Sequence, residues 1–308
     1  MPSPAFVFSP AYEADIGPHV FPTFKYRRLK ERILETGLAG PEAFVEPRPL
    51  DRAILRLAHS EGYLADLFAL RRTGATMASE LPLTRDIARW FELAAYGTAT
   101  ATDLALARGA AMHLGGGFHH AFADHAEGFC YLNDIGVAIR ALQHDGRVRR
   151  VAVVDCDVHQ GNGTASLFRG DDTVFTFSMH QEYNYPSPKE PGDLDVGLED
   201  GTGDDEYLAE LERALERVWG SGPELVVYQA GADAYREDQL GGLGLTMAGL
   251  EARDRMVLEG CAGRGVPAAV TLGGGYARRL EDTVAIHLTT CRVALELARG
   301  GPGGGNAS

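Results

Sequence analysis

Asp155, Asp157 and His159 stand at alternate positions at the end of the apolar stretch VAVV that begins at residue 151. Side chains two residues apart in extended backbone point to the same side, so Asp157 and His159 can be directed at one point. Carboxylates and imidazoles are ligands of transition metals. A third ligand has to come from another segment, and Asp233, which follows a later apolar run in LVVYQAGAD, is our candidate. Three protein ligands leave a fourth position for water or substrate, which is typical of a catalytic zinc site.

Two further groups that can do chemistry follow runs of glycine. His119 and His120 end the stretch GGGFHH, and Tyr276 ends the stretch GGGY. A neutral histidine whose second ring nitrogen is held by an acceptor is a common general base, and a phenol can donate a hydrogen bond to a developing oxyanion. Taken singly, each motif is also compatible with a solvated turn or a half-buried loop residue. Their joint occurrence after successive apolar runs favours one site.

The apolar runs that precede these groups predict buried strands of a parallel sheet, because both faces of such a sheet are covered. The predicted strands are Val151 to Val154, Thr173 to Phe177, Leu225 to Tyr228, Ala268 to Leu272 and a short one over residues 110–114. Ligands of open α/β sheets bind beyond the carboxyl ends of the strands. We therefore expect one edge of the sheet to gather the groups named above.

Helical patterns alternate with the predicted strands. Asp204 and Thr246 are candidate N-caps of two helices, and residues 87–108 are long enough for one or two more. This alternation predicts the α/β fold class, as a single domain with a mostly parallel central sheet flanked by helices on both faces. We expect the domain to span residues 1–299 and the Gly-rich segment 300–308 to be a flexible tail.

Composition narrows the class of protein. The 308 residues are 45% hydrophobic, enough for a sizeable core, and carry a formal charge of −14. That charge argues against direct nucleic-acid binding and at most favours cationic substrates. The four cysteines form no CxxC pair, so we expect reduced thiols in a cytoplasmic protein. No stretch has the pattern of a leader peptide or approaches the roughly 18 apolar residues of a membrane span.

The motifs GGGFHHA, GFCYLNDIGVAI, DCDVHQGNG, AGAD and LGGGY together resemble the zinc-dependent histone deacetylase family, which has the arginase/deacetylase fold. They come in the family's order and cover roughly residues 110–290. The HQGN and GGGFHH wordings and the opening 19-HVFPTFKY-26 are most similar to class IV members and to bacterial histone deacetylase-like amidohydrolases. The resemblance implies a hydrolase of acylated amines.

For the metals, the resemblance implies one zinc ion per chain, held by Asp157, His159 and Asp233. Two carboxylates and one imidazole can also hold Fe²⁺ or Co²⁺. A dinuclear ureohydrolase site needs a further carboxylate two residues after the histidine, where this chain has Gly161. The family also holds a potassium ion through backbone carbonyls. The matching positions for potassium are Asp155, Asp157, His159, Ser178 and Met179.

For catalysis, the resemblance implies that His120 is the general base and acid and that His119 tunes the site electrostatically. Asp155 matches the acceptor behind His119. Asn162 stands behind His120, where many class I members have an aspartate, and we expect this departure to leave His120 less basic. Tyr276 matches the carbonyl-polarising tyrosine of active members.

For substrate binding, the resemblance implies aromatic tunnel walls at Phe129 and Tyr185, lined further by the glycine loops at Gly117 and Gly274. The family's gatekeeper aspartate, which grips the substrate backbone, has no match that the segment 79-SELPLTRDIARW-90 makes plain. The recognition of a macromolecular substrate is thus the least specified part of the resemblance.

The resulting hypothesis is hydrolysis of an N-acyl-lysine amide in proteins or peptides. Within the same chemistry, the alternatives are deacylation of small amines such as acetylpolyamines, which a specific acidic gate residue favours, and removal of long fatty acyl chains, which needs an apolar pocket. An alternative of another class is a catalytically silent acyl-lysine reader. The set of His120, Asp157, His159, Asp233 and Tyr276 speaks against the reader.

Overall fold

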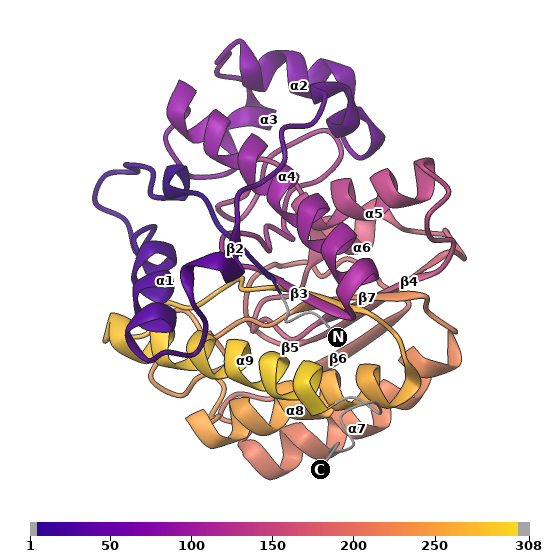
Figure 1. The fold of residues 1–308 in the computed structure, drawn as a ribbon. Helices are drawn as coiled ribbons and strands as arrows, with labels where there is room; N and C mark the ends of the chain where they lie inside the picture. The colour runs from indigo at the N-terminus through magenta and orange to yellow at the C-terminus, as the bar shows by residue number, and fades with distance from the viewer. Residues whose placement is uncertain (1–4, 301–308) are drawn as a thin grey trace.

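The centre of the fold is a single sheet in which every neighbouring pair of strands is parallel (Figure 1). The structure is a computed structural model that describes residues 5–300, with side chains up to residue 297. The strand order among these residues is β2-β1-β3-β8-β7-β4-β5-β6. The strands are β1 (Ala5–Val7), β2 (Phe44–Val45), β3 (Ala110–His113), β4 (Val151–Asp155), β5 (Val174–Gln181), β6 (Leu194–Leu198), β7 (Leu225–Gln229) and β8 (Ala268–Thr271). The predicted α/β class with a mostly parallel sheet is confirmed.

Helices cover both faces of this sheet, so the molecule has three layers (Figure 1). Helices α4, α5 and α6 lie on one face, and α7, α8 and α9 lie on the other, with α1 packed against α9. The helices are α1 (Lys25–Glu35), α2 (Glu61–Phe68), α3 (Gly74–Met77), α4 (Arg85–Arg108), α5 (Asp134–His144), α6 (Asn162–Leu167), α7 (Asp204–Gly220), α8 (Met247–Arg264) and α9 (Leu280–Gly300). Short 3-10 helices are Pro10–Tyr12, Pro41–Ala43 and Arg52–Leu57.

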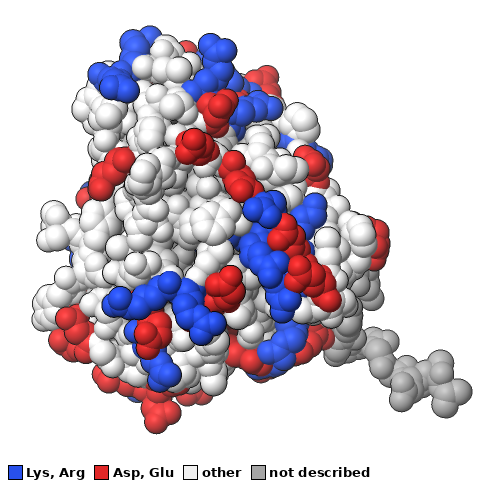
Figure 2. All heavy atoms as spheres, turned by 90° about the vertical axis from the view of Figure 1, so that its left-hand side faces the viewer, with Lys and Arg blue, Asp and Glu red and all other residues white. Residues whose placement is uncertain are grey.

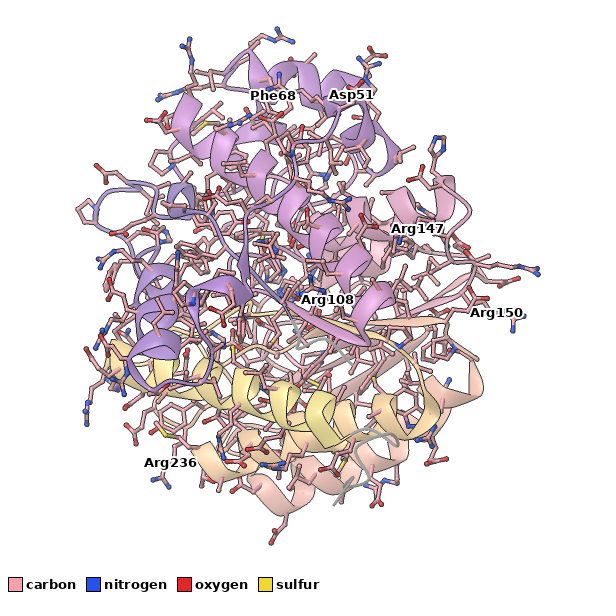
Figure 3. All side chains as sticks on the ribbon, viewed as in Figure 1. Asp51, Phe68, Arg108, Arg147, Arg150 and Arg236 are labelled. Atoms are coloured by element: carbon pink, nitrogen blue, oxygen red, sulfur yellow. The ribbon has the colours of Figure 1, made fainter. Side chains whose placement is uncertain are left out.

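The central strands are continuous apolar runs because both of their faces are covered. Every residue of β4, β7 and β8 is buried, whereas the edge strand β6 alternates between partly buried and exposed positions up to its buried last residue, Leu198. Figure 3 marks the two ends of the strands: Arg150, directly before β4, lies at the right, and Arg236, beyond β7, lies at the lower left. The carboxyl ends of the strands therefore face away from Arg150.

Two sequence expectations about individual elements need correction. Strand β5 extends to Gln181, so Ser178 and Met179 lie inside the strand and not after it. Asp204 is the first residue of α7 and not its N-cap, because its carboxylate accepts hydrogen bonds from the backbone and hydroxyl of Thr246 instead, at 2.9 and 2.6 Å. Residues 85–108 form one continuous helix, which agrees with the one or two helices predicted there. Strands β1, β2 and β6, short or at the edge, were not predicted.

Other expectations concern a helix cap, the end of the chain and membrane-spanning helices. Thr246 caps α8 as predicted, accepting from the backbone N–H of Gly249 at 3.0 Å. Gly300 is the last residue of α9, and the rest of the predicted tail lies outside the described residues. None of the helices in the described part of the chain has the length and apolar character needed to cross a membrane.

Charged side chains of both signs are interspersed on the face that carries α1 (Figure 2). Helix α1 lies at the left of Figure 1 and so faces the viewer in Figure 2. Arg27 pairs with Glu13 and Glu31 at 2.7 Å, and Arg32 pairs with Glu35 at the same distance. On this face the net negative charge of the chain is not gathered into one acidic patch.

Candidate active site

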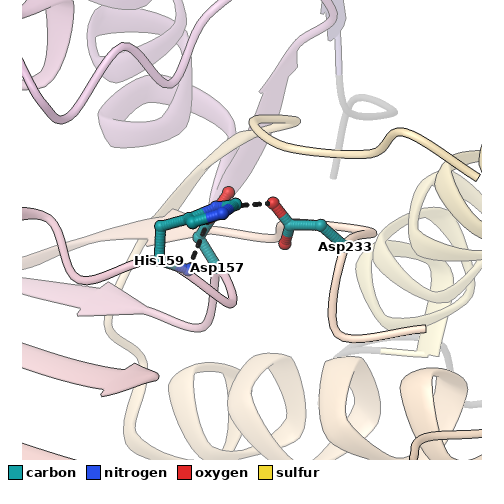
Figure 4. A group of neighbouring side chains, drawn as sticks. All are labelled: Asp157, His159 and Asp233. Carbon is teal, nitrogen blue, oxygen red and sulfur yellow. Dashed lines mark hydrogen bonds and ion pairs between the residues drawn. The ribbon is translucent and has the colours of Figure 1, made fainter. Parts of the chain in front are cut away.

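Asp157, His159 and Asp233 converge beyond the carboxyl ends of β4 and β7 (Figure 4). These two strands are neighbours in register, with Asp155 opposite Gln229, so the loops that follow them meet. One ligand atom from each of the three side chains lies within 4.8 Å of the others, and all three side chains are buried. His159 Nδ1 lies 3.2 Å from Asp157 Oδ1 and 3.3 Å from Asp233 Oδ2.

The charges of this group fit a cation. Burial and the negative charge of Asp157 raise the pKa of Asp233 to about 7. Burial by itself lowers the pKa of His159, but the carboxylates of Asp157 and Asp233 raise it to about 10. Asp233 Oδ2 is buried and is contacted only by the ion pair with His159, whereas Asp233 Oδ1 accepts a hydrogen bond from the backbone of Val158 at 2.9 Å. Two buried, crowded carboxylates, one with an oxygen that accepts no hydrogen bond, are a donor set that a divalent metal satisfies.

The glycine loop after β8 closes over the same group. The backbone N–H of Gly274 donates to Asp157 Oδ2 at 2.8 Å. A Cβ atom at position 274 would collide with the carboxylates of Asp233 and Asp157. Glycine is therefore required there by the close approach of backbone to the candidate ligands.

His119 and His120 follow β3 and lie next to the candidate metal ligands. His119 Nδ1 lies 2.7 Å from Asp155 Oδ2, and His120 Nδ1 lies 2.7 Å from Asn162 Oδ1. The two Nε2 atoms are 3.1 Å apart. Asp155 is the last residue of β4 and Asn162 the first of α6, so both partners belong to the segment that carries Asp157 and His159.

The two adjacent histidines have opposite pKa shifts. Burial lowers the pKa of His119, but the charges of Asp155 and Asp157 outweigh it and raise the pKa to about 9. For His120, burial and the positive charges of His119 and His159 all act in one direction and hold the pKa well below its ordinary value. His120 is therefore neutral, and its Nδ1–H donates to Asn162 Oδ1, which leaves the Nε2 lone pair as an acceptor that faces His119 Nε2 at 3.1 Å.

Tyr276 follows β8, and Asp238 fixes its backbone beside the candidate metal ligands. Its backbone N–H donates to Asp238 Oδ2 at 2.6 Å, while Asp238 Oδ1 accepts from the backbones of Leu240 and Gly241 at 2.8 and 3.0 Å. Burial and the charges of Asp233 and Asp157 raise the pKa of the Tyr276 phenol well above its ordinary value. The hydroxyl therefore stays protonated and can donate a hydrogen bond.

A narrow cavity leads from the surface to these groups. Its outer part has a volume of about 180 Å³ and is lined by Phe129, Tyr185, Leu240 and Tyr276 above His120 and His159. Its inner part, beside Gly117 and Gly274, is about 20 Å³, close to the space of one water molecule. The wall positions Phe129 and Tyr185 implied by the resemblance thus line one opening.

Sequence reasoning missed three residues that hold the loops of the site. Gln229, at the end of β7, donates to the carbonyl of Gly117 at 2.7 Å. Asp134 accepts from the backbones of Gly117 and Phe118 at 2.9 and 2.7 Å. Lys25 is 2% exposed and donates to the carbonyl of Gly273 at 2.6 Å. Each acts between distant segments, so no local pattern indicates it.

An acidic residue at the mouth of the cavity was also missed. Glu80 is exposed, lines the outer part of the cavity and has a φ of +65°, a conformation uncommon for residues other than glycine. It lies in the segment where no gate residue was plain from the sequence. The positive φ of Glu80 is a property of the backbone that the sequence does not indicate.

The positions implied for potassium lie on neighbouring backbones. Asp155 of β4 and Ser178 of β5 are register partners, with Met179 next along β5. Asp157 and His159 belong to the loop that continues β4. Gln181, at the end of β5, donates its backbone N–H to the carbonyl of Val158 at 2.9 Å and so ties that loop to the strand.

Comparison with known proteins identifies the family to which this chain is similar. The model of the histone deacetylase domain matches residues 19–291. An uncharacterized protein of Picosynechococcus sp. is 41% identical over 300 residues, which cover 94% of this chain and 98% of that protein. Histone deacetylase 2 of Arabidopsis thaliana is 32% identical over 282 residues, covering 86% and 73%.

A solved structure extends the likeness to three dimensions. The crystal structure of an HDAC homolog from Aquifex aeolicus superposes with a TM-score of 0.83 at 26% identity, covering 97% of this chain and 89% of that one. The parallel sheet together with these likenesses identifies the chain as an α/β amidohydrolase. The chain belongs to the histone deacetylase family.

Proposed function

We propose that this protein is a zinc-dependent deacylase that hydrolyses the amide bond of an N-acyl-lysine carrying a short acyl group. The observation that carries this proposal is the convergence of Asp157, His159 and Asp233 beside a neutral His120 at the bottom of a narrow cavity. Zinc supplies Lewis-acid chemistry in such a site, because it polarises a carbonyl and lowers the pKa of a water molecule toward about 7.

His120 moves the protons of the reaction. With its Nδ1–H donated to Asn162, its Nε2 accepts the proton of the attacking water. When the C–N bond breaks, the same Nε2 delivers that proton to the leaving amine, so that a carboxylic acid and a free amine are formed. His119, charged through its contact with Asp155, keeps His120 neutral in the resting protein by repulsion.

Tyr276 stabilises the charge that develops on the carbonyl oxygen. Its protonated hydroxyl donates a hydrogen bond to the oxyanion as the water attacks. Phe129 and Tyr185 line the opening above it, where they enclose the methylene groups of the lysine side chain.

The size of the cavity favours a short acyl group. The inner part holds about 20 Å³ and the outer part about 180 Å³. Drug-sized ligands occupy pockets of about 300–1,000 Å³. A long fatty chain has no matching space beside Gly117 and Gly274, so this alternative is disfavoured.

Glu80 favours a second candidate function, deacylation of a small acylated amine that carries a further positive charge. Its carboxylate stands at the mouth of the cavity, where a cationic substrate enters. An acidic gate was the feature that this alternative required. Both candidates use the same chemistry and differ in what is attached to the acylated nitrogen.

A potassium ion beside the metal group is part of the same proposal. The carbonyls of Asp155, Asp157 and Ser178, with those of His159 and Met179, come from a loop and a strand that lie together. They provide neutral oxygen ligands rather than the several carboxylates that calcium prefers.

Replacement of Tyr276 by phenylalanine tests the proposed hydrolysis. Loss of one oxyanion donor lowers kcat by about 10² to 10³, while ground-state binding changes far less. Tyr276→Phe should therefore keep bound zinc and acyl-lysine affinity and lose turnover. The measurement is steady-state kinetics on acetyl-lysine peptides, longer acyl-lysine peptides and acetylated polyamines, with binding and metal content determined in parallel.

Tyr183→Phe is the matched control, because Tyr183 lies close in the chain to the cavity residue Tyr185 but is 74% exposed. It should turn over like the wild type. A kcat for Tyr276→Phe within about threefold of the wild type makes Tyr276 a wall residue. Binding of acyl-lysine by the wild type without turnover of any substrate in the panel supports the reader instead.

A further inference from the structure

Glu127 belongs to a tight turn that also forms the wall of the cavity. Residues 127 and 130 exchange backbone hydrogen bonds of 3.0 and 2.7 Å, and the two residues between them, Gly128 and Phe129, have φ values of +50° and +64°. Two consecutive positive φ angles are typical of a type I′ turn. The backbone N–H of Phe129 also donates to the carbonyl of Ser79 at 3.0 Å. The turn thus places Phe129 on the cavity and holds Glu127 at a fixed position beside it.

The Glu127 carboxylate joins two residues of the site. Its Oε1 accepts from the side-chain amide of Asn162 at 2.6 Å and from the hydroxyl of Tyr185 at 2.8 Å. Asn162 in turn contacts His120 Nδ1 at 2.7 Å through its amide oxygen. A chain of hydrogen bonds therefore runs from the ring of His120 through Asn162 to a carboxylate.

The chemistry of this chain decides which way the amide of Asn162 points. A carboxylate only accepts hydrogen bonds, so the NH₂ group of Asn162 has to face Glu127 and its carbonyl oxygen has to face His120. A carbonyl oxygen only accepts, so the Nδ1 of His120 has to carry the proton. Without Glu127 the amide can rotate, and its NH₂ group can then favour the opposite tautomer of His120.

We propose that Glu127 is a positioning residue that fixes Asn162, and through it the Nδ1–H tautomer of His120, and that anchors Tyr185 at the opening of the cavity. The assignment of catalytic work to His120 rests on the proposed function, whereas the tautomer itself does not. The carboxylate that an aspartate provides directly in many class I members is supplied here through the amide of Asn162.

Kinetics of Glu127 variants test the consequence for turnover. Outer partners of catalytic groups are typically worth about 10- to 100-fold in activity, so Glu127→Ala should lower kcat by that factor with unchanged zinc content. Glu127→Gln keeps an accepting carbonyl oxygen, and its loss should be about two- to tenfold, the range of a weakened hydrogen bond. Asp172→Asn is the control, because Asp172 is exposed in the turn before β5, away from Asn162, Tyr185 and the His125 that pairs with Glu127 at 3.4 Å. It should leave kcat unchanged.

A double-mutant cycle shows whether Glu127 acts through Asn162. In an Asn162→Ala background, Glu127→Ala should cause no further loss of kcat beyond about twofold, because the residue that it positions is absent. Independent, multiplying losses overturn the proposal, as does a Glu127→Ala protein with the wild-type kcat.

Nitrogen NMR of ¹⁵N-histidine-labelled protein reads the tautomer without any turnover. The wild type should show His120 protonated at Nδ1, with the signals assigned through His120→Gln, and Glu127→Ala should show a mixture of tautomers. An unchanged tautomer in Glu127→Ala overturns the proposal. A shifted tautomer together with a wild type inactive on every substrate preserves the positioning role and removes the proposed function.

Discussion

The amino ends and the carboxyl ends of the strands, called here the amino edge and the carboxyl edge of the sheet, differ in the size of their cavities and in the chemistry of the residues around them. At the amino edge lies a broad hollow of about 930 Å³, lined among others by Arg147, Arg149 and Glu224, all exposed. At the carboxyl edge the cavity is several times smaller, yet Asp157, which lines its inner part, and the neighbouring Asp233 are both buried. The larger hollow therefore does not mark the site.

The difference teaches that the cost of burying charge is a better guide to function than volume. Exposed arginines at the amino edge remain solvated and cost little. Burial of two carboxylates next to each other is unfavourable unless a cation or hydrogen bonds compensate for it. Buried carboxylates at the carboxyl ends of the strands, where α/β proteins bind ligands, therefore indicate a functional site.

Removal of a candidate metal ligand tests the comparison with the largest expected effect. Asp233→Ala should lose stoichiometric zinc and lower kcat/KM by about 10³-fold or more, since a catalytic metal supplies several kcal/mol of transition-state stabilisation. The fold should remain, because one of two repelling carboxylates is removed. Elemental analysis, kinetics and circular dichroism measure these outcomes, with Asp205→Ala on the exposed side of α7 as the control. A zinc-loaded and active Asp233→Ala protein rules out this ligand set.

Sequence alone could locate the carboxyl edge because the groups there follow apolar runs. Asp157 and His159 alternate after β4, and the glycine runs before His120 and Tyr276 are visible motifs. The extension of β5 to Gln181 was not predictable, because polar residues in that strand are buried by loops from elsewhere. Pattern shows where a strand begins more reliably than where it ends.

The supporting contacts were beyond sequence reasoning for a related reason. Glu127 meets Asn162 across 35 positions of the chain, and Asp238 meets Tyr276 across 38. Nothing in the neighbourhood of a solitary acidic residue distinguishes such a contact from a solvated surface position. Glu80 is similar, since its backbone conformation and not its residue type places it at the cavity.

Acid sensitivity tests the same comparison at the level of stability. His59 lies under the loops of the carboxyl edge, where its Nδ1–H donates to the carbonyl of Phe122 at 2.9 Å and its Nε2 accepts from the backbone of Asn133 at 3.0 Å. Burial lowers its pKa to about 4. The unfolded chain therefore takes up a proton first, near pH 6.5, so the stability that neutral His59 contributes is present above pH 6.5 and is lost as the pH falls toward 4.

The expected loss from His59 is on the order of 1–3 kcal/mol across that range. Urea unfolding at a series of pH values measures it. His59→Gln should be less stable at neutral pH and show a shallower decline between pH 6.5 and 4. His144→Gln is the control, since His144 is exposed at the amino-edge end of α5 and should leave the decline unchanged. Equal declines in the wild type and His59→Gln would show that His59 does not carry this linkage.

Charge changes at the two mouths give the smallest expected effect and separate the edges most directly. Arg149 is exposed at the amino edge, where its backbone N–H donates to Glu224 at 2.6 Å and its side chain lines the large hollow. Because exposed charges are screened over about 8–10 Å at ordinary ionic strength, Arg149→Glu should change kcat/KM by less than about twofold and the free energy of unfolding by less than about 0.5 kcal/mol.

Glu80→Gln removes a single charge at the carboxyl edge and should raise KM for cationic amine substrates by about two- to fivefold, with kcat unchanged, as expected for an exposed ion pair of about 0.2–1 kcal/mol. Kinetics on neutral and cationic acyl substrates measure both variants. A tenfold loss in Arg149→Glu, or an identical KM for cationic substrates in Glu80→Gln and the wild type, reverses the roles assigned here to the two edges.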